Sequence, residues 1–249
     1  MLDQITPVVL TRDEEPNIAR TLGQLRWARE VIVLDSGSTD ATVAIAQSFP
    51  NVRVVERPFD SFAGQWTFAQ SIVRTPWLLA LDADYFVPEE LAQELASLQP
   101  NVHAYTAAFR YAVGGRVLRA SLYPPRVVLA ENAHVRFWQD GHAQRVRVDG
   151  DTGMLRTPFI HDDRKSFRAF LDRQQRYMRQ EASKLRATSW RDLNWPARVR
   201  KLIVIAPLAV LLHTLFAKAL ILDGLPGLRY TWERFTAELM LSRELLRGR

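Results

Sequence analysis

Two carboxylates stand two residues apart in the segment LALDADYFVPEE, as Asp82 and Asp84. Asp82 is the last residue of the apolar run 77–82, and Asp84 follows it. The run predicts a buried strand that ends on an acid. Carboxylate oxygens are the hard ligands that Mg²⁺ or Mn²⁺ accepts, and such an ion can neutralise a diphosphate and stabilise it as a leaving group. Taken alone, the pair fits a solvated turn equally well, so support must come from elsewhere in the chain.

A second predicted strand, 30–35, also ends on an acid, Asp35 in VIVLDSGSTDAT. A carboxylate there can accept hydrogen bonds from a base or a ribose, and Gly37 lets the backbone approach a ligand closely. Ser38 is expected to cap the helix that follows. The alternative is a purely structural role for this segment, as a turn and a helix cap at Asp40.

The elements that position these acids are predicted from alternating β-branched runs and helical patterns across residues 1–100, which indicate parallel βαβ units. The expected strands are 7–11, 30–35, 52–56 and 77–82; helices begin near residue 16, after the turn 36–40, near residue 64 and at Pro88. Ligands of such sheets bind beyond the carboxyl ends of the strands, where both acids would lie.

Beyond residue 103 the runs become longer and β-like, with a hairpin expected at Gly114 and Gly115, and they predict an added mixed sheet that serves as an acceptor platform. A helix with one arginine-rich face is expected over 167–186. The predicted organisation is a catalytic domain at 1–163, with a donor half at 1–100 and an acceptor half at 101–163, followed by a helical extension at 164–249.

Charge is concentrated in one segment of this cysteine-free chain: residues 164–201 hold 12 Lys or Arg and 3 Asp or Glu, in a protein with a net charge of +6. Without thiols, any metal must be held by oxygen or imidazole. The N-terminus lacks the basic and apolar order of a signal peptide, so a cytoplasmic location is expected.

The most apolar stretch, 202–222, has nearly the length of a bilayer span but contains Pro207, His213 and Lys218. Trp, Tyr and Arg flank it, and these residues favour the membrane interface. Three interpretations remain: a surface-lying or re-entrant helix pair, a true span, and a helix buried in a soluble or oligomeric packing.

Four segments together resemble inverting family-two glycosyltransferases of the GT-A fold, and their order and spacing match across residues 5–90. They are TRDEE at 11–15, LDSGSTDAT at 34–42, FAGQWTFA at 62–69 and LDADYFV at 81–87. The resemblance implies a Rossmann-like, mostly parallel α/β sheet, a nucleotide-sugar donor and a divalent ion, Mg²⁺ or Mn²⁺.

The resemblance also assigns roles. Thr11, Glu14 and Asp35 would hold the nucleoside, and Asp82 with Asp84 the ribose-phosphate edge and the metal, Asp84 being the direct ligand. Gln65 would reach the diphosphate, although Trp66 and Thr67 stand where relatives often carry a basic residue and an Asn. The segments 131–155 and 159–167 are similar to the lipopolysaccharide core glycosyltransferase branch, in which His161 would be a late histidine that joins the metal or diphosphate.

An inverting transfer needs a base within reach of the acceptor hydroxyl. Asp140 is the first candidate, His142 the second and Glu131 the third, although relatives often place an acid where this chain has Gln144. Arg126 is a candidate phosphate contact because it is a cation near the predicted site. Tyr123 is assigned to core packing.

The predicted function is therefore metal-dependent, inverting transfer of a sugar from a nucleoside diphosphate sugar, UDP-sugar first, to a lipid-linked or lipopolysaccharide-core acceptor. The enzyme would act at the cytoplasmic face of the inner membrane, as a peripheral or monotopic protein whose basic segment meets anionic headgroups. A polyprenyl-phosphate glycosyltransferase is the close alternative, since a phosphate acceptor needs no strong base.

Other classes fit less well. A membrane scaffold would have no use for the acids and His161, and in a nucleic-acid-binding protein the basic run would not adjoin an apolar one. A dinucleotide-binding dehydrogenase would carry the motif G-x-G-x-x-G after the first strand, and this chain lacks that motif there. No oligomeric state is predicted.

Overall fold

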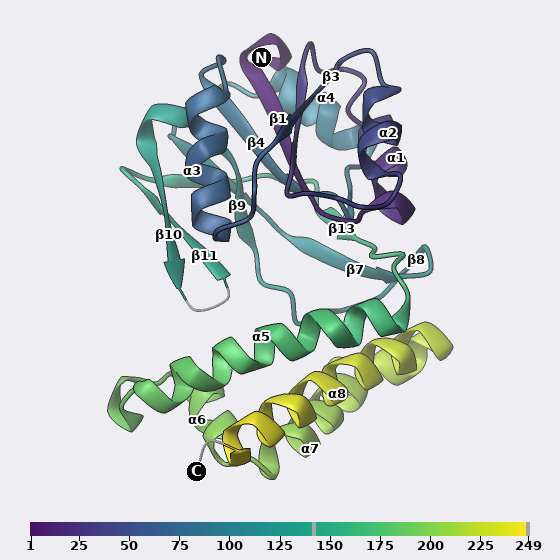
Figure 1. The fold of residues 1–249 in the computed structure, drawn as a ribbon, viewed down its shortest axis with the longest axis vertical. Helices are drawn as coiled ribbons and strands as arrows, with labels where there is room; N and C mark the ends of the chain where they lie inside the picture. Colours follow the sequence, from purple (N-terminus) through teal and green to yellow (C-terminus); the bar gives the residue numbers. More distant parts are fainter. Residues whose placement is uncertain (141–142, 248–249) are drawn as a thin grey trace. The chain divides into compact units, whose positions relative to one another are not determined.

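The computed structural model describes residues 1–140 and 143–247, which form two compact units (Figure 1). The N-terminal unit comprises Met1–Tyr111 and Leu122–Arg164. The C-terminal unit comprises Ala112–Ser121 and the chain from Lys165 onward.

A seven-stranded sheet forms the centre of the N-terminal unit, in the order β12-β6-β9-β4-β1-β2-β3. The four strands from β3 to β4 are parallel: β1 (Ile5–Thr11), β2 (Val31–Asp35), β3 (Val52–Glu56) and β4 (Trp77–Asp82). Beyond β4 lie β9 (Arg126–Glu131), antiparallel to both neighbours, then β6 (Ala104–Ala107) and β12 (Thr152–Met154). The predicted mostly parallel α/β sheet is thereby confirmed.

Helices cover both faces of this sheet (Figure 1), which is why its central strands carry continuous apolar runs. On one face Val9 packs with Ile18 and Leu22 of α1 (Glu15–Gly23). On the other, Val8 packs with Trp66 of α3 (Phe62–Ile72). Helices α2 (Thr42–Gln47) and α4 (Glu89–Ser97) pack on the same face of the sheet as α1. Because Val8 and Val9 point to opposite faces, they are buried in two separate cores.

The sequence predicted an added sheet beyond residue 103. This prediction is only partly right, because β6, β9 and β12 extend the central sheet instead. A smaller mixed sheet does form, in the order β5-β13-β7-β8. Its strands are β5 (Tyr85–Phe86), β13 (Phe159–His161), β7 (Phe109–Val113) and β8 (Arg116–Val117). The predicted hairpin joins β7 to β8 at Gly114 and Gly115, whose φ angles of 60° and 86° suit glycine.

A separate antiparallel hairpin, β10 (Val135–Asp140) and β11 (Ala143–Val148), packs against α3. Phe137 stacks on Trp66 with ring centroids 5.9 Å apart. The backbone N–H of Ala63, in the first turn of α3, donates to Oε1 of Gln139. Because α3 begins after the carboxyl end of β3, Gln139 near the end of β10 lies toward that edge of the sheet.

The C-terminal unit is mainly helical. Its elements are α5 (Phe167–Ala187), α6 (Trp195–Lys201), α7 (Ile205–Leu212) and α8 (Leu225–Arg247), with short 3-10 helices at Trp190–Asp192 and Leu220–Asp223 and a π-helical turn at His213–Ala217. The predicted helix at 167–186 matches α5. Ala182 and Leu185 of α5 pack against Leu241 and Leu245 of α8.

The apolar stretch 202–222 is divided rather than continuous. Ile203 and Ala219 have φ angles of 56° and 54°, and α7 with its π-helical turn fills the interval between them. Side chains such as Leu208, Leu212 and Phe216, at helical spacing, are more than half exposed. Within the described ranges, the structure has no helix that combines the length and the apolarity needed to cross a membrane.

Candidate functional site

The acids singled out in the sequence meet at the carboxyl edge of the central sheet. Thr11 and Asp35 are register partners at the ends of β1 and β2, and Asp82, the last residue of β4, pairs with Leu10. Parallel strands bring these ends together, as in other open α/β sheets whose ligands bind at this edge. The predicted site residues of three strands therefore lie side by side.

Asp35 is buried and braces the turn that follows β2. Its carboxylate accepts hydrogen bonds from the Oγ of Thr11 (3.0 Å), the Oγ of Ser38 (2.5 Å) and the backbone N–H groups of Gly37 (2.9 Å) and Ser38 (2.8 Å). Ser38 therefore does not cap the next helix as predicted; α2 begins four residues later, at Thr42. The contact of Asp35 with a nucleoside stays a prediction.

Glu14 and Gln65 flank the same edge. The Oε2 of Glu14 accepts from Nδ2 of the buried Asn17 at 2.8 Å. The amide NH₂ of Gln65 donates to the carbonyls of Arg57 and Pro58, while its Oε1 is buried without a hydrogen-bond partner within the described part of the chain. Gln65 thus holds the loop before α3 and retains one acceptor.

Asp84 and His161 form the closest acid–imidazole pair of this edge. Their Oδ2 and Nε2 atoms lie 3.4 Å apart, and both side chains are nearly buried. Two contacts set this distance: His161 pairs with Tyr85 across β13 and β5, and the backbone N–H of Asp162 donates to the carbonyl of Asp84. The downstream histidine is thereby brought beside the acidic pair, 77 residues earlier in the chain.

Thr21 of α1 fixes the turn that carries the acidic pair. Its buried hydroxyl lies 2.5 Å from the carbonyl oxygen of Ala83 and 3.0 Å from that of Tyr85. The hydroxyl shares its proton between two carbonyls that would otherwise be buried with no intramolecular partner. A helical threonine gives no sign of this role in the sequence.

An aromatic cluster surrounds His161. Tyr111 stacks on the imidazole at 4.7 Å between ring centroids, and Tyr85 and Tyr123 complete the cluster at 5.7 and 5.2 Å. The hydroxyls of Tyr85 and Tyr123 lie 2.7 Å apart. Tyr123 was assigned to the core by its type alone, and its place beside the imidazole emerges only from the fold.

Arg126 lies over the ring of Tyr123, 4.7 Å from its centroid. Burial, and next the charge of Asp82, raise the pKa of Tyr85, and the same two causes raise the pKa of Tyr123. Burial would lower the pKa of Arg126, but the Tyr123 and Tyr85 hydroxyls and Asp82 raise it overall. The site thus keeps neutral tyrosines and a cationic arginine beside Asp82.

A partly buried group of ion pairs, centred on the buried Asp162, supports the loop that follows His161. Asp162 accepts from Arg20 of α1 at 2.7 Å and from the Nε of Arg164 at 2.8 Å. Asn17 accepts from the backbone N–H of Arg164 with its Oδ1. Arg164 is thereby held by Asp162 and by Asn17.

The predicted base Asp140 lies at the end of β10, where its carboxylate accepts from the Nε of Arg145 at 3.0 Å. His142 falls outside the described residues. Glu131, the third candidate, is wrong: it pairs with Trp77, the first residue of β4, whereas Asp82 is the last. At about 3.3 Å per residue, this separates Glu131 from the acidic edge by roughly 17 Å.

The donor set at Asp84 and His161 fits a divalent ion. A carboxylate oxygen and an imidazole nitrogen 3.4 Å apart can both reach one ion at the usual distances of about 2.1 Å, and the mixed donors suit Mn²⁺ better than Mg²⁺. Asp82 does not form a three-residue group of metal-ligating atoms with Asp84 and His161. Within the described ranges, the group of this kind consists of His103, Glu131 and His134.

Residues 7–158 match the family model for glycosyl transferase family 2. The chain is 32% identical over 119 residues to the lipopolysaccharide core biosynthesis glycosyltransferase LpsC of Rhizobium meliloti, covering 46% of this chain and 42% of LpsC. It is 39% identical over 93 residues to an uncharacterized glycosyltransferase of Rickettsia bellii, covering 37% of this chain and 31% of that protein. The chain thus spans about a third to two fifths of the length of these curated relatives.

Among solved structures, S. aureus TarS 1-349 in complex with UDP-GlcNAc is similar with a TM-score of 0.50 and 12% identity, covering 99% of this chain and 92% of that one. At this identity the likeness concerns the fold alone. The overall fold therefore agrees with the predicted GT-A architecture.

Proposed function

Since the chain belongs to glycosyl transferase family 2, we propose that it transfers a sugar from a nucleoside diphosphate donor to an acceptor hydroxyl at the carboxyl edge of its central sheet. The observation that carries this proposal is the pairing of Asp84 with His161, just beyond the strand that ends on Asp82. UDP-sugars are the first donors to consider, because the TarS complex of similar fold holds UDP-GlcNAc.

In this proposal Asp84 and His161 hold a divalent ion, which neutralises the diphosphate and favours its departure when bound. Arg126 offers a further positive charge at the same edge, next to Asp82. The turn braced by Asp35 shapes the nucleoside end of the site. The acceptor hydroxyl would attack from the opposite side of the sugar, give its proton to the predicted base Asp140 and displace the diphosphate, which inverts the anomeric centre.

The acceptor proposed is a lipid-linked or lipopolysaccharide-core saccharide, as the similarity to LpsC suggests. Contact with an anionic membrane surface, at the cytoplasmic face of the inner membrane, belongs to the same proposal. Exposed apolar side chains on α7 and its π-helical turn support it, as do the many arginines of α5. If these short helices lie on the membrane surface, their exposed apolar side chains would contact the lipid.

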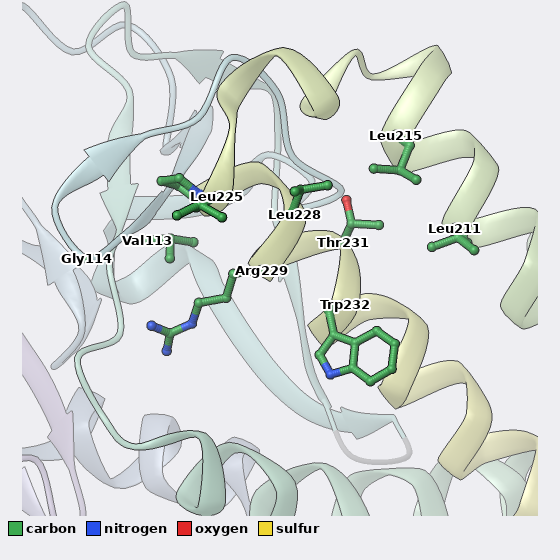
Figure 2. A pocket seen from close by; sticks show the side chains of 10 residues that line it. Val113, Gly114, Leu211, Leu215, Leu225, Leu228, Arg229, Thr231 and Trp232 are labelled. Atoms are coloured by element: carbon green, nitrogen blue, oxygen red, sulfur yellow. The ribbon is translucent and has the colours of Figure 1, made fainter.

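An apolar pocket of about 750 Å³ within the C-terminal unit adds support (Figure 2). Leu211 and Leu215 face it from one side, and Leu225, Leu228 and Trp232 of α8 from the other. Arg229 supplies the one charged side chain of its lining within the described residues. An apolar chain beside a cation matches the chemistry of an anionic lipid.

The test of the donor site is Asp84→Ala, measured by sugar transfer from a panel of UDP-sugars with Mn²⁺. Loss of one oxyanion-stabilising group costs roughly 10²–10³-fold in rate, and loss of the ion costs more. We expect at least a 10³-fold fall in transfer and loss of Mn²⁺-dependent UDP binding, with unchanged circular dichroism. Asp151→Ala, at an exposed position outside the site, is the control and should transfer normally. Ordinary activity in Asp84→Ala would refute the assignment.

Polyprenyl-phosphate transfer remains the alternative because the base is assigned to Asp140 on position alone. Asp140→Asn should lower transfer to a saccharide hydroxyl by about 10²–10⁴-fold, the usual contribution of a general base. If the variant retains its activity and accepts a polyprenyl phosphate, the alternative replaces the saccharide acceptor. The same panel of donors serves both assays.

A further inference from the structure

Two histidines and a glutamate converge at the edge of the central sheet opposite the acidic site. His103 directly precedes β6, Glu131 ends β9, and His134 ends the 3-10 helix Asn132–His134. Glu131 pairs with Trp77 at the start of β4, so the group lies roughly 17 Å along that strand from Asp82. No step of the proposed transfer uses these residues.

Their ligand atoms face one another closely. The Nδ1 of His103 is 2.7 Å from Oε2 of Glu131, and the Nε2 of His134 is 3.9 Å from the same oxygen. One ligand atom from each of the three residues lies within 4.8 Å of the other two. The two imidazoles stack almost parallel, with centroids 3.7 Å apart and planes 12° apart, so both nitrogens approach one carboxylate oxygen.

The backbone holds this arrangement in place. The N–H of Glu131 donates to the carbonyl of His103, and the N–H of Asp149 donates to the carbonyl of His134, both at 2.8 Å. Gly150, with φ of 126°, lies so close to the His103 ring that an added Cβ would stand 3.1 Å from its Cδ2. The three side chains therefore project from hydrogen-bonded strand ends and not from a free loop.

We propose that His103, Glu131 and His134 bind a divalent transition metal, Zn²⁺ being the best match, at a site separate from the donor site. Four ligands at about 2.0–2.1 Å in tetrahedral geometry lie roughly 3.4 Å from one another. The observed 2.7 and 3.9 Å bracket that value. Two imidazoles and one carboxylate leave the fourth position to water, and all three side chains are accessible enough for an ion to enter.

The stacked imidazoles would have to turn on binding, because each ring must point a nitrogen lone pair at the ion and parallel stacked rings point theirs in parallel. The ion would join the ends of β6 and β9 to the 3-10 helix. A site of this kind stabilises the fold by binding the native state alone.

The experiment uses the whole chain with Asp84→Asn, which removes the proposed donor-site ligand, titrated with Zn²⁺ by calorimetry and with Co²⁺ by visible absorption. One equivalent should bind, with the intense absorption of tetrahedral Co²⁺. Zn²⁺ at 100 times Kd should raise the thermal transition by about 5–10 °C.

Adding His103→Asn and His134→Asn should abolish the bound equivalent and the thermal shift. His213→Asn, at an exposed histidine outside the group, is the matched control and should change neither. Thermal unfolding without metal checks that the variants fold, and His134→Gln alone replaces the double variant if they do not. The proposal would be overturned if the variant without the two imidazoles bound Zn²⁺ equally well. It would also be overturned if Asp84→Asn bound no Zn²⁺ at all. Neither result depends on sugar transfer, so the proposed function is tested separately.

Discussion

At the scale of single residues, the groups that would touch substrate depend on others that would not. Asp84 can face His161 only because its turn is held by the Thr21 hydroxyl and by the backbone of Asp162. Asp162 is in turn held by Arg20. Positioning of this kind matters because misplacing a ligand by about 1 Å can cost 10²-fold in rate.

Thr21→Val tests this dependence directly. Valine keeps the shape but leaves the carbonyls of Ala83 and Tyr85 without their donor, so the acidic turn should relax. We expect kcat/KM for sugar transfer to fall by about 10–100-fold, and stability by about 1–3 kcal/mol. Thr21→Ser retains the hydroxyl and should recover most of the activity. Equal losses in both variants would show that the methyl group matters and the hydroxyl does not.

At the scale of elements, hydrogen bonds from loop backbone to helix side chains hold helices and loops together. Glu94 of α4 accepts hydrogen bonds from the backbone N–H groups of Arg156 and Thr157 at 2.7 and 2.9 Å. Burial would raise the pKa of Glu94, but these two donors lower it overall. The segment between β12 and β13, which leads to His161, is thereby tied to α4.

The pH dependence follows from that lowered pKa. A carboxyl whose folded-state pKa lies below its unfolded value, about 4.3 for Glu, stabilises the fold above that value and loses this stabilisation as pH falls through the folded pKa. Glu94→Gln should therefore cost less than about 1 kcal/mol at pH 7, and the difference from the parent should vanish as pH falls below 4. Urea unfolding at both pH values measures this. A difference that grows on acidification would contradict the assignment.

Packing between elements makes a second prediction at this scale. A Cβ on Gly227, in the first turn of α8, would overlap the carbonyl oxygen of Leu220, whereas one on Gly23 would meet nothing within 4 Å. Gly227→Ala should destabilise the C-terminal unit by about 1–3 kcal/mol. Gly23→Ala should be neutral or stabilise by up to about 1 kcal/mol. Chemical denaturation followed by tryptophan fluorescence distinguishes the two, and a neutral Gly227→Ala would mean that α8 begins differently.

At the scale of the molecule, two units carry different surfaces. The N-terminal unit gathers acids and tyrosines at one sheet edge, and the C-terminal unit exposes leucines and aromatic residues. We propose the first surface for a metal-bound diphosphate. We propose the second for the membrane contact, because large apolar side chains are exposed on it.

Leu212→Glu tests the proposed membrane contact. Leu212 is 56% exposed, so the change leaves the fold intact but places a charge on the apolar face. Co-sedimentation with vesicles of anionic lipid should fall at least tenfold. Met154→Glu, at a position 64% exposed in the N-terminal unit, is the control and should bind vesicles as the parent does. Equal binding by all three proteins would exclude this face as the contact.

The sequence by itself determined the parallel sheet, the strand ends at Asp35 and Asp82, and the helix that became α5. These features depend on local periodicity, which tertiary contacts only reinforce. It also placed His161 in the site by resemblance.

Tertiary structure alone decided which distant side chains meet. The turn geometry that buries Asp35, the Thr21 hydroxyl under the acidic turn and the aromatic cluster around His161 involve residues up to 77 positions apart. Glu131 shows the reason most plainly: sequence position suggested a catalytic base, but antiparallel pairing of β9 with β4 carries it to the opposite edge, beside His103. Strand direction and register arise from packing across the whole sheet, so a local pattern does not contain them.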